Sequence, residues 1–66
     1  MYKVGAVVEY INELSFRNGE SCEVVAFYKK PGFSCLYSVM FEDGEIERDV
    51  INSELCSIES SYHLFA

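Results

Sequence analysis

Apolar and polar residues alternate along most of this chain, in short runs that end at turn-forming residues. Alternation of this kind sends successive side chains to opposite faces of an extended segment, so it predicts half-buried β-strands. We expect five strands and, before the last of them, one short 3-10 turn. The strands are predicted over residues 4–11, 21–30, 33–41, 46–50 and 55–58, and the turn over residues 51–54.

Two dipeptides predict tight hairpin turns. Pro31-Gly32 combines the fixed φ of proline with the positive φ open to glycine, and Asp43-Gly44 is a common hairpin pair. Each turn sets which residues face each other across its hairpin. The first predicts the pairs Tyr28–Cys35, Ala26–Tyr37, Val24–Val39 and Cys22–Phe41, and the second predicts Phe41–Ile46, Val39–Arg48 and Tyr37–Val50. Both registers turn Tyr37, Val39 and Phe41 toward the interior, so these three residues are predicted to form the centre of the core.

Two places depart from simple alternation. Arg48 would point inward, so either its stem lies across the end of the barrel with the guanidinium at the rim, or a β-bulge alters the strand there. Residues 12–19 have no clear period and end in an Asn-Gly pair, which predicts a loop. Leu14 and Phe16 are expected to tuck beneath this loop.

Four segments of the chain resemble the SH3-like small barrels of the Tudor, KOW and chromo-like group. That group shows an opening x-V-G-x-x-V, then G-x-x-x-x-V-V, then Y-x-V-x-F-x-D-G, and finally V-x-x-x-x-L. The corresponding segments here are residues 4–8, 19–25, 37–44 and 50–55. The resemblance implies an all-β fold, a small five-stranded SH3-like (Tudor-like) barrel with one short 3-10 turn before the last strand. The barrel would span residues 1–58, followed by a C-terminal tail at 59–66.

Composition places the chain among small folded domains. Its 66 residues allow one domain with a small core, and an apolar content of 50% with five Tyr and five Phe favours folding over disorder. The sequence contains no apolar run of membrane-spanning length and does not begin like a signal peptide, so we expect a cytoplasmic protein with no membrane association. Cys22, Cys35 and Cys56 lack a metal-binding spacing and are expected to be buried free thiols.

Little in the sequence points to catalysis. His63 is the only histidine, and its surroundings do not suggest a nucleophile paired with a base, so no enzymatic activity, metal or cofactor is expected. An aromatic cage for a cation is another candidate, and it would use Tyr10, Phe33, Tyr37 and Phe41 with Asp43 or Glu45. Tyr37 and Phe41 are also the best core candidates, and the core interpretation is favoured.

Two surface features remain. Residues 42–66 carry a net charge of −6 while residues 1–41 are neutral, so the second half is either a solvated rim or a surface that attracts a basic partner. The predicted register also places four apolar side chains together on the outward face, namely Val25, Phe27, Leu36 and Met40. A patch of this kind predicts contact with the C-terminal tail or the long loop, with a second copy of the chain, or with a partner.

These features favour a non-enzymatic protein-interaction module, such as a small phage or mobile-element regulator that binds a host protein. A protein partner is expected, and a homodimer is an open alternative. The predicted partner-binding residues are Val25, Phe27, Leu36, Met40, Glu42, Asp43, Glu45 and Glu47. Nucleic-acid binding by a KOW-like module through Lys29, Lys30 and Arg17 is the rival, which the net charge of −6 opposes. Acidic mimicry of nucleic acid is a third possibility.

Overall fold

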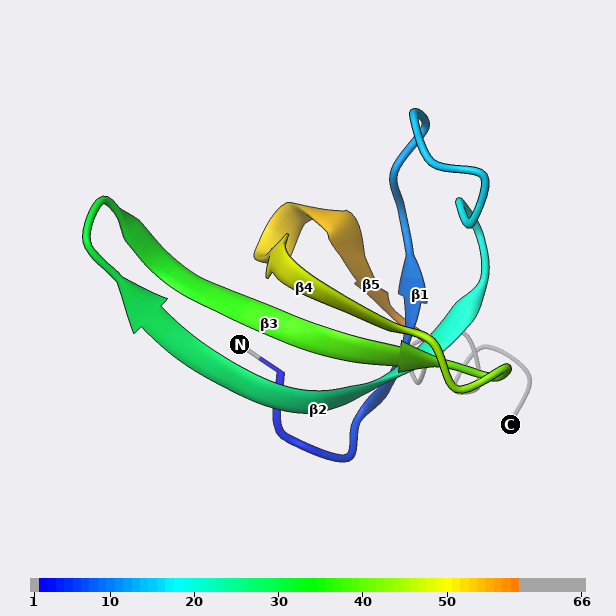
Figure 1. Ribbon diagram of the computed structural model, residues 1–66, viewed down its shortest axis with the longest axis horizontal. Coiled ribbons are helices and arrows are strands. Elements are labelled where there is room, and N and C mark those ends of the chain that lie inside the picture. The colour runs from blue at the N-terminus through cyan, green and yellow to red at the C-terminus, as the bar shows by residue number, and fades with distance from the viewer. Residues whose placement is uncertain (1, 59–66) are drawn as a thin grey trace.

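The computed structural model describes residues 2–58 as an all-β fold, a single antiparallel sheet with one 3-10 turn (Figure 1). The elements are β1 (Val7–Tyr10), β2 (Ser21–Lys30), β3 (Phe33–Phe41), β4 (Ile46–Ile51), η1 (Asn52–Glu54) and β5 (Leu55–Ser57). The predicted all-β class, the five strands and the 3-10 turn are confirmed, although β1 is shorter than predicted. The predicted tail at 59–66 lies outside the described residues. Within residues 2–58, no helix has the length and apolar character needed to cross a bilayer.

The strand order in the sheet is β4-β3-β2-β1-β5, so β1 lies beside both β2 and β5. Figure 1 shows β2 and β3 as a long curved hairpin, with the Pro31-Gly32 turn at its far end. The β1–β2 loop projects from the opposite part of the molecule. Strands β4 and β5 form the two edges and follow each other in sequence through η1, and the pairing of the described residues leaves the sheet open between them.

The core lies on the inner face of the bent sheet. It contains Val8, Tyr10, Cys22, Val24, Cys35, Tyr37, Val39, Phe41, Val50 and Leu55. The predicted central trio is confirmed, because Tyr37, Val39 and Phe41 are 1%, 0% and 2% exposed. The buried Tyr37 hydroxyl accepts a hydrogen bond from the Tyr2 backbone N–H at 3.1 Å, while burial raises the pKa of this phenol. Removal of these side chains from water is the main source of stability in a domain this small.

The β2–β3 register agrees with the prediction at both ends of the hairpin but not in its middle. Cys22 faces Phe41 and Val24 faces Val39, as predicted, but the register then shifts by one residue at Val25. Beyond this irregularity Phe27 faces Tyr37, so the predicted Ala26–Tyr37 and Tyr28–Cys35 pairs are wrong. An extra residue of this kind reverses which face the following side chains occupy. A second shift, between Tyr28 and Lys30, restores the predicted register. The Pro31-Gly32 turn itself is confirmed, because Lys30 faces Phe33 across it.

The β3–β4 hairpin also differs from the prediction. The Phe41 N–H donates to the Glu45 carbonyl at 2.8 Å, so the loop has three residues, with Gly44 at φ +91°. As a result Ile46 faces Met40 and is 47% exposed, and the predicted Phe41–Ile46 and Val39–Arg48 pairs are wrong.

An irregularity in β4, where Asp49 adopts a φ of +56°, restores the predicted pairing of Tyr37 with Val50. Of the two alternatives for Arg48, the structure therefore shows the bulge, and the Arg48 side chain is exposed.

Candidate functional site

The four apolar residues predicted to share an outward face do not form one surface. Phe27 lies opposite the core residue Tyr37, with ring centroids 6.4 Å apart, so it belongs to the inner side of the sheet. Leu36 is 2% exposed, while Val25 at the irregularity and Met40 are half-buried. The shift at Val25 is what turns Phe27 to the inner side. Two consecutive valines in the sequence give no sign of it.

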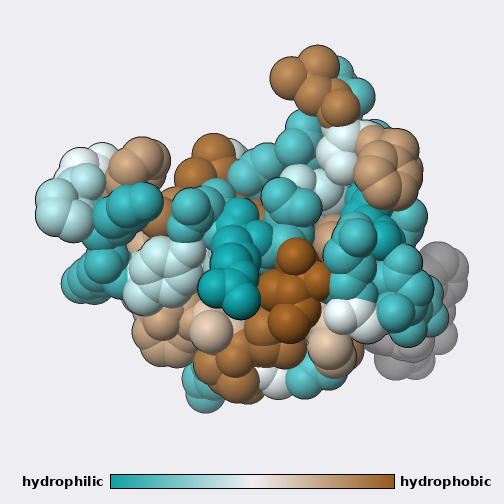
Figure 2. All heavy atoms as spheres, viewed as in Figure 1, coloured by the Kyte–Doolittle hydropathy of each residue, from teal (hydrophilic) through white to brown (hydrophobic). Residues whose placement is uncertain are grey.

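Among residues 2–58, the large apolar side chains with the highest exposure instead lie on the loop between β1 and β2. Leu14 is 98% exposed and Phe16 is 87% exposed, so the prediction that they tuck beneath the loop is wrong. Figure 2 shows this loop as a projection with hydrophobic side chains at its end. Together we call Leu14 and Phe16 the apolar prong. Sequence reasoning identified the loop but missed the exposure of these two side chains, because an aperiodic segment does not show which way its side chains point.

Hydrogen bonds within the loop hold the apolar prong in place. The Leu14 N–H donates to Asn12 Oδ1 at 3.0 Å, and the Asn12 N–H donates to Asn18 Oδ1 at 2.8 Å. The Asn12 side-chain amide also donates to the Tyr10 hydroxyl at 3.1 Å and to Glu54 Oε2 at 3.0 Å, which joins the loop to η1. The loop is therefore a defined structure whose apolar residues face outward.

Arg17 ties this loop to the β3–β4 hairpin. Its guanidinium donates through Nε to Glu45 Oε1 at 2.8 Å, through Nη1 to Glu20 Oε1 at 2.9 Å, and through Nη2 to Asp43 Oδ2 at 2.7 Å. The residue is only 7% exposed. Hydrogen bonds between charged groups in this fork geometry are the strong ones. The bond from Arg17 is the main cause that holds the pKa of Asp43 below its usual range, with a further contribution from the Glu45 N–H.

The Arg17 guanidinium occupies the position beside Phe41 that the predicted aromatic cage would offer to a bound cation. It lies 4.4 Å from the centre of the Phe41 ring, whose edge-on neighbour is Tyr10 at 5.4 Å. Tyr10, Tyr37 and Phe41 are buried in the core, while Phe33 is 54% exposed. The cation beside Phe41 is therefore supplied by the chain itself, and the favoured core interpretation of these aromatic residues is confirmed.

The predicted acidic residues of the hairpin divide into two pairs. Asp43 and Glu45 hold Arg17 but keep 59% and 58% of their side chains exposed. Glu42 and Glu47 are exposed, and in residues 2–58 neither has an ion pair. The hairpin therefore remains an acidic surface, although half of its carboxylates also have a structural role. Arg17, in contrast, is engaged and does not serve as a free cation for phosphate.

The edge strands are protected against pairing with another strand. In β4, the irregularity at Asp49 interrupts the edge, and Glu47 and Arg48 place charged side chains along it. The Tyr28 hydroxyl donates to the Asp49 carboxylate, and this bond is the main cause that raises the pKa of Tyr28. The other edge, β5, has only three residues. Bulges, charges and short edges discourage strand addition, so contacts with a partner would be made by side chains.

Other reactive groups do not assemble into a site in the described part of the chain. Cys22 and Cys35 are buried free thiols as predicted, whereas Cys56 is exposed, so the prediction that its thiol is buried is wrong. Burial is the main cause that raises the pKa of the Cys22 thiol to about 11, so this thiol is protonated at neutral pH. Residues 2–58 contain no group of three or more side chains placed to hold a metal ion, and His63 lies outside these residues.

Comparison of the chain with protein-family models, curated proteins and solved structures found no significant match. The resemblance to SH3-like barrels therefore stays a prediction.

Proposed function

We propose that this protein is a non-enzymatic protein-interaction module built on an SH3-like small barrel, and that the apolar prong inserts into an apolar pocket of a protein partner. The observation that carries the proposal is the exposure of Leu14 and Phe16, at 98% and 87%, on a loop with a defined hydrogen-bonded structure. Scattered apolar residues are common on protein surfaces. Two large ones held together on a fixed projection form exposed apolar surface of the kind that marks an interaction site.

Burial of the apolar prong would supply the affinity. Transfer of a leucine or phenylalanine side chain from water to an apolar pocket contributes about 1.5–3 kcal/mol, so the pair contributes roughly 3–6 kcal/mol. The hydrogen bonds of Asn12 fix the loop before the partner arrives. A binding element that is already ordered loses less conformational entropy on association, so more of the contact energy appears as affinity.

The charges around the apolar prong indicate the charge of the partner surface. Arg17 leaves the cluster of Glu20, Asp43 and Glu45 with a net charge of −2, because one cation faces three carboxylates. The next acidic residue along the loop is Glu13, which is exposed. An acidic surround of this kind attracts a basic surface and repels phosphates. We infer a protein partner whose apolar pocket has Lys or Arg at its rim, and a regulator that binds a host protein would fit this description.

Crosslinking at the apolar prong tests the proposal. The photoreactive residue p-benzoylphenylalanine would replace Phe16 in one variant and Phe33 in another, because Phe33 is 54% exposed but lies on the β2–β3 hairpin. We expect a discrete protein adduct after irradiation in cells for the Phe16 variant only. The change Leu14→Ser in the same chain should remove it.

Two results would contradict the proposal. Equal adducts at both positions would show contact without specificity, and no protein adduct at position 16 would exclude the apolar prong as the binding element. A gel-shift assay at low salt tests the rival, since retention of DNA or RNA by the wild-type chain would favour a nucleic-acid-binding module. An adduct that contains two copies of this chain would identify a homodimer.

A further inference from the structure

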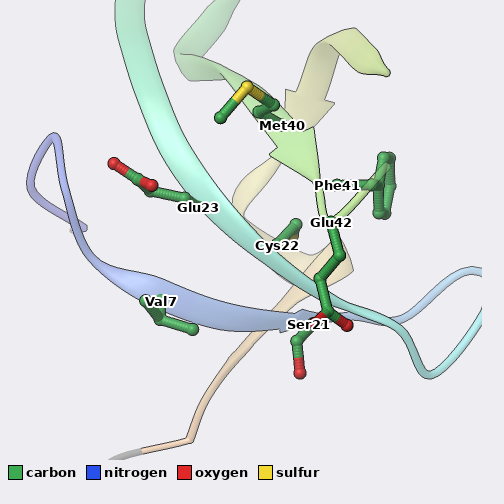
Figure 3. Close-up of a pocket in the computed structure, with 7 residues that line it drawn as sticks. All are labelled: Val7, Ser21, Cys22, Glu23, Met40, Phe41 and Glu42. Carbon is green, nitrogen blue, oxygen red and sulfur yellow. The ribbon is translucent and has the colours of Figure 1, made fainter. Parts of the chain in front are cut away.

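A shallow hollow lies on the outer face of the sheet, across β1, β2 and β3. Its volume is about 260 Å³, and it is lined by Val7, Ser21, Cys22, Glu23, Met40, Phe41 and Glu42. Figure 3 shows Val7 and Met40 on opposite sides of the β2 ribbon. The pairing of the strands explains this arrangement, because Val7 faces Glu23 and Glu23 in turn faces Met40. The hollow therefore follows directly from the register of three neighbouring strands.

The chemistry of the hollow combines an apolar floor with negative charge. Val7 is 53% exposed, and Met40 is half-buried with the exposed Ile46 beside it on β4. Glu23 and Glu42 are exposed members of the lining, and in the part of the chain that the structure describes no Lys or Arg forms an ion pair with either. The nearby cation Arg17 is already held by three other carboxylates. The hollow thus presents apolar surface and two carboxylates without a countercharge.

We propose that this hollow receives a lysine or arginine side chain of the protein partner, an inference that rests on the proposed function. The aliphatic stem of such a residue would pack on Val7 and Met40, and its cationic end would reach Glu23 or Glu42. Long basic side chains bury their stems on apolar surface while their charged ends stay near water. The flexible thioether of Met40 adapts to stems of different shape.

Other occupants fit the hollow less well. A neutral apolar side chain would cover Val7 and Met40 but would remove water from Glu23 and Glu42 without supplying a partner for their charges, which is costly. An anion would be repelled by the same two carboxylates. A metal ion would need more ligands, and residues 2–58 contain no group of three or more potential metal ligands gathered together. Only an aliphatic cation satisfies both parts of the lining.

The test uses n-butylguanidinium, which has an apolar stem and a planar cation, as the probe of the full chain. Binding would be followed by NMR through the methyl groups of Val7 and Met40. We expect saturable shifts of both methyl groups, and an affinity that falls about two- to five-fold for each carboxylate removed in Glu23→Gln plus Glu42→Gln. The matched control, Glu13→Gln plus Glu47→Gln, removes the same net charge elsewhere and should leave the affinity unchanged.

A second variant keeps the test decisive if the double substitution prevents the chain from folding. The change Val7→Lys places a cation in the lining of the hollow at an exposed position, and it should abolish the shift that the probe causes at the Met40 methyl group. Neutral n-pentanol should bind more weakly than n-butylguanidinium at the same two methyl groups. Absence of shifts at Val7 and Met40, equal binding of pentanol, or equal weakening by the control variant would each overturn the inference.

The outcome is separable from that of the proposed function. A variant with Leu14→Ser and Phe16→Ser should bind the probe as the wild type does, because neither residue lines the hollow. If a partner crosslinks at the apolar prong but the probe does not bind, only the inference about the hollow fails. If the probe binds at the hollow but no protein crosslinks at the apolar prong, the proposed function fails and the hollow remains a site for aliphatic cations.

Discussion

Two leucines provide a test of the structure, because the same substitution should destabilise the protein at one position and have almost no effect at the other. Leu14 is 98% exposed and Leu36 is 2% exposed. The sequence predicts the reverse, with Leu14 tucked beneath a loop and Leu36 on an outward patch. The changes Leu14→Ala and Leu36→Ala therefore distinguish the observed register and loop from the predicted ones.

The expected magnitudes follow from burial. Truncation of a buried leucine to alanine costs about 2–5 kcal/mol. We expect the lower half of that range for Leu36, because its cross-strand neighbours Tyr28 and Ile51 are partly exposed and can move into the space. For Leu14 the buried fraction is negligible, and the free energy of unfolding should change by less than about 0.5 kcal/mol. A domain of 66 residues has a total free energy of unfolding of roughly 3–10 kcal/mol. Leu36→Ala should therefore remove a large share of this stability.

Urea unfolding followed by circular dichroism is the assay. The midpoint should fall clearly for Leu36→Ala and stay at the wild-type value for Leu14→Ala, while the dependence of the free energy on urea stays the same in both. A loss of more than about 1 kcal/mol for Leu14→Ala would show that the loop covers this side chain. A change within about 0.5 kcal/mol for Leu36→Ala would mean that the β2–β3 register described above is wrong.

Three further outcomes are expected. Because Arg17 holds the pKa of Asp43 below its usual range, the native state binds fewer protons than the unfolded chain. The resulting stabilisation is present above about pH 4 and is lost as the pH falls through the native pKa. Asp43→Asn should therefore lose less stability than the wild type when the pH is lowered, and an equal loss would contradict the ion pair. Thiol labelling of the native protein at pH 8 should modify Cys56 rapidly, because it is exposed, and Cys22 slowly, because it is buried with a pKa of about 11. Rapid modification of Cys22 would show that its strand opens. Finally, Gly44→Ala should lower the free energy of unfolding by about 1–2 kcal/mol, because Gly44 has a φ of +91°, which strains any residue with a Cβ. An added Cβ would meet no atom within 4 Å, so a steric clash does not add to this cost. An unchanged midpoint of urea unfolding would argue against the three-residue loop.

Arg17 shows how one side chain links the two parts of the proposed interaction surface. It joins the loop that carries the apolar prong to Asp43 and Glu45, which lie 26 and 28 positions further along the chain. The same guanidinium covers the face of the core residue Phe41 at 4.4 Å. The position of the apolar prong therefore depends on the acidic hairpin, and partner binding at one should be sensitive to changes in the other.

The sequence by itself determined the strands, the Pro31-Gly32 turn and the inward direction of Tyr37, Val39 and Phe41. These features follow from alternation and turn chemistry, which act between residues close together in the chain. The bounds of β2 and β3 agree with the predicted 21–30 and 33–41 for this reason.

Tertiary structure decided the rest. The irregularity at Val25 moved Phe27 to the inner side, and the three-residue β3–β4 loop moved Ile46 to the surface. The irregularity at Asp49 then restored the pairing of Tyr37 with Val50. The burial of Arg17 likewise depends on carboxylates from a distant hairpin. A local pattern carries no information about such contacts, because the free energy that fixes them appears only when the strands pack together.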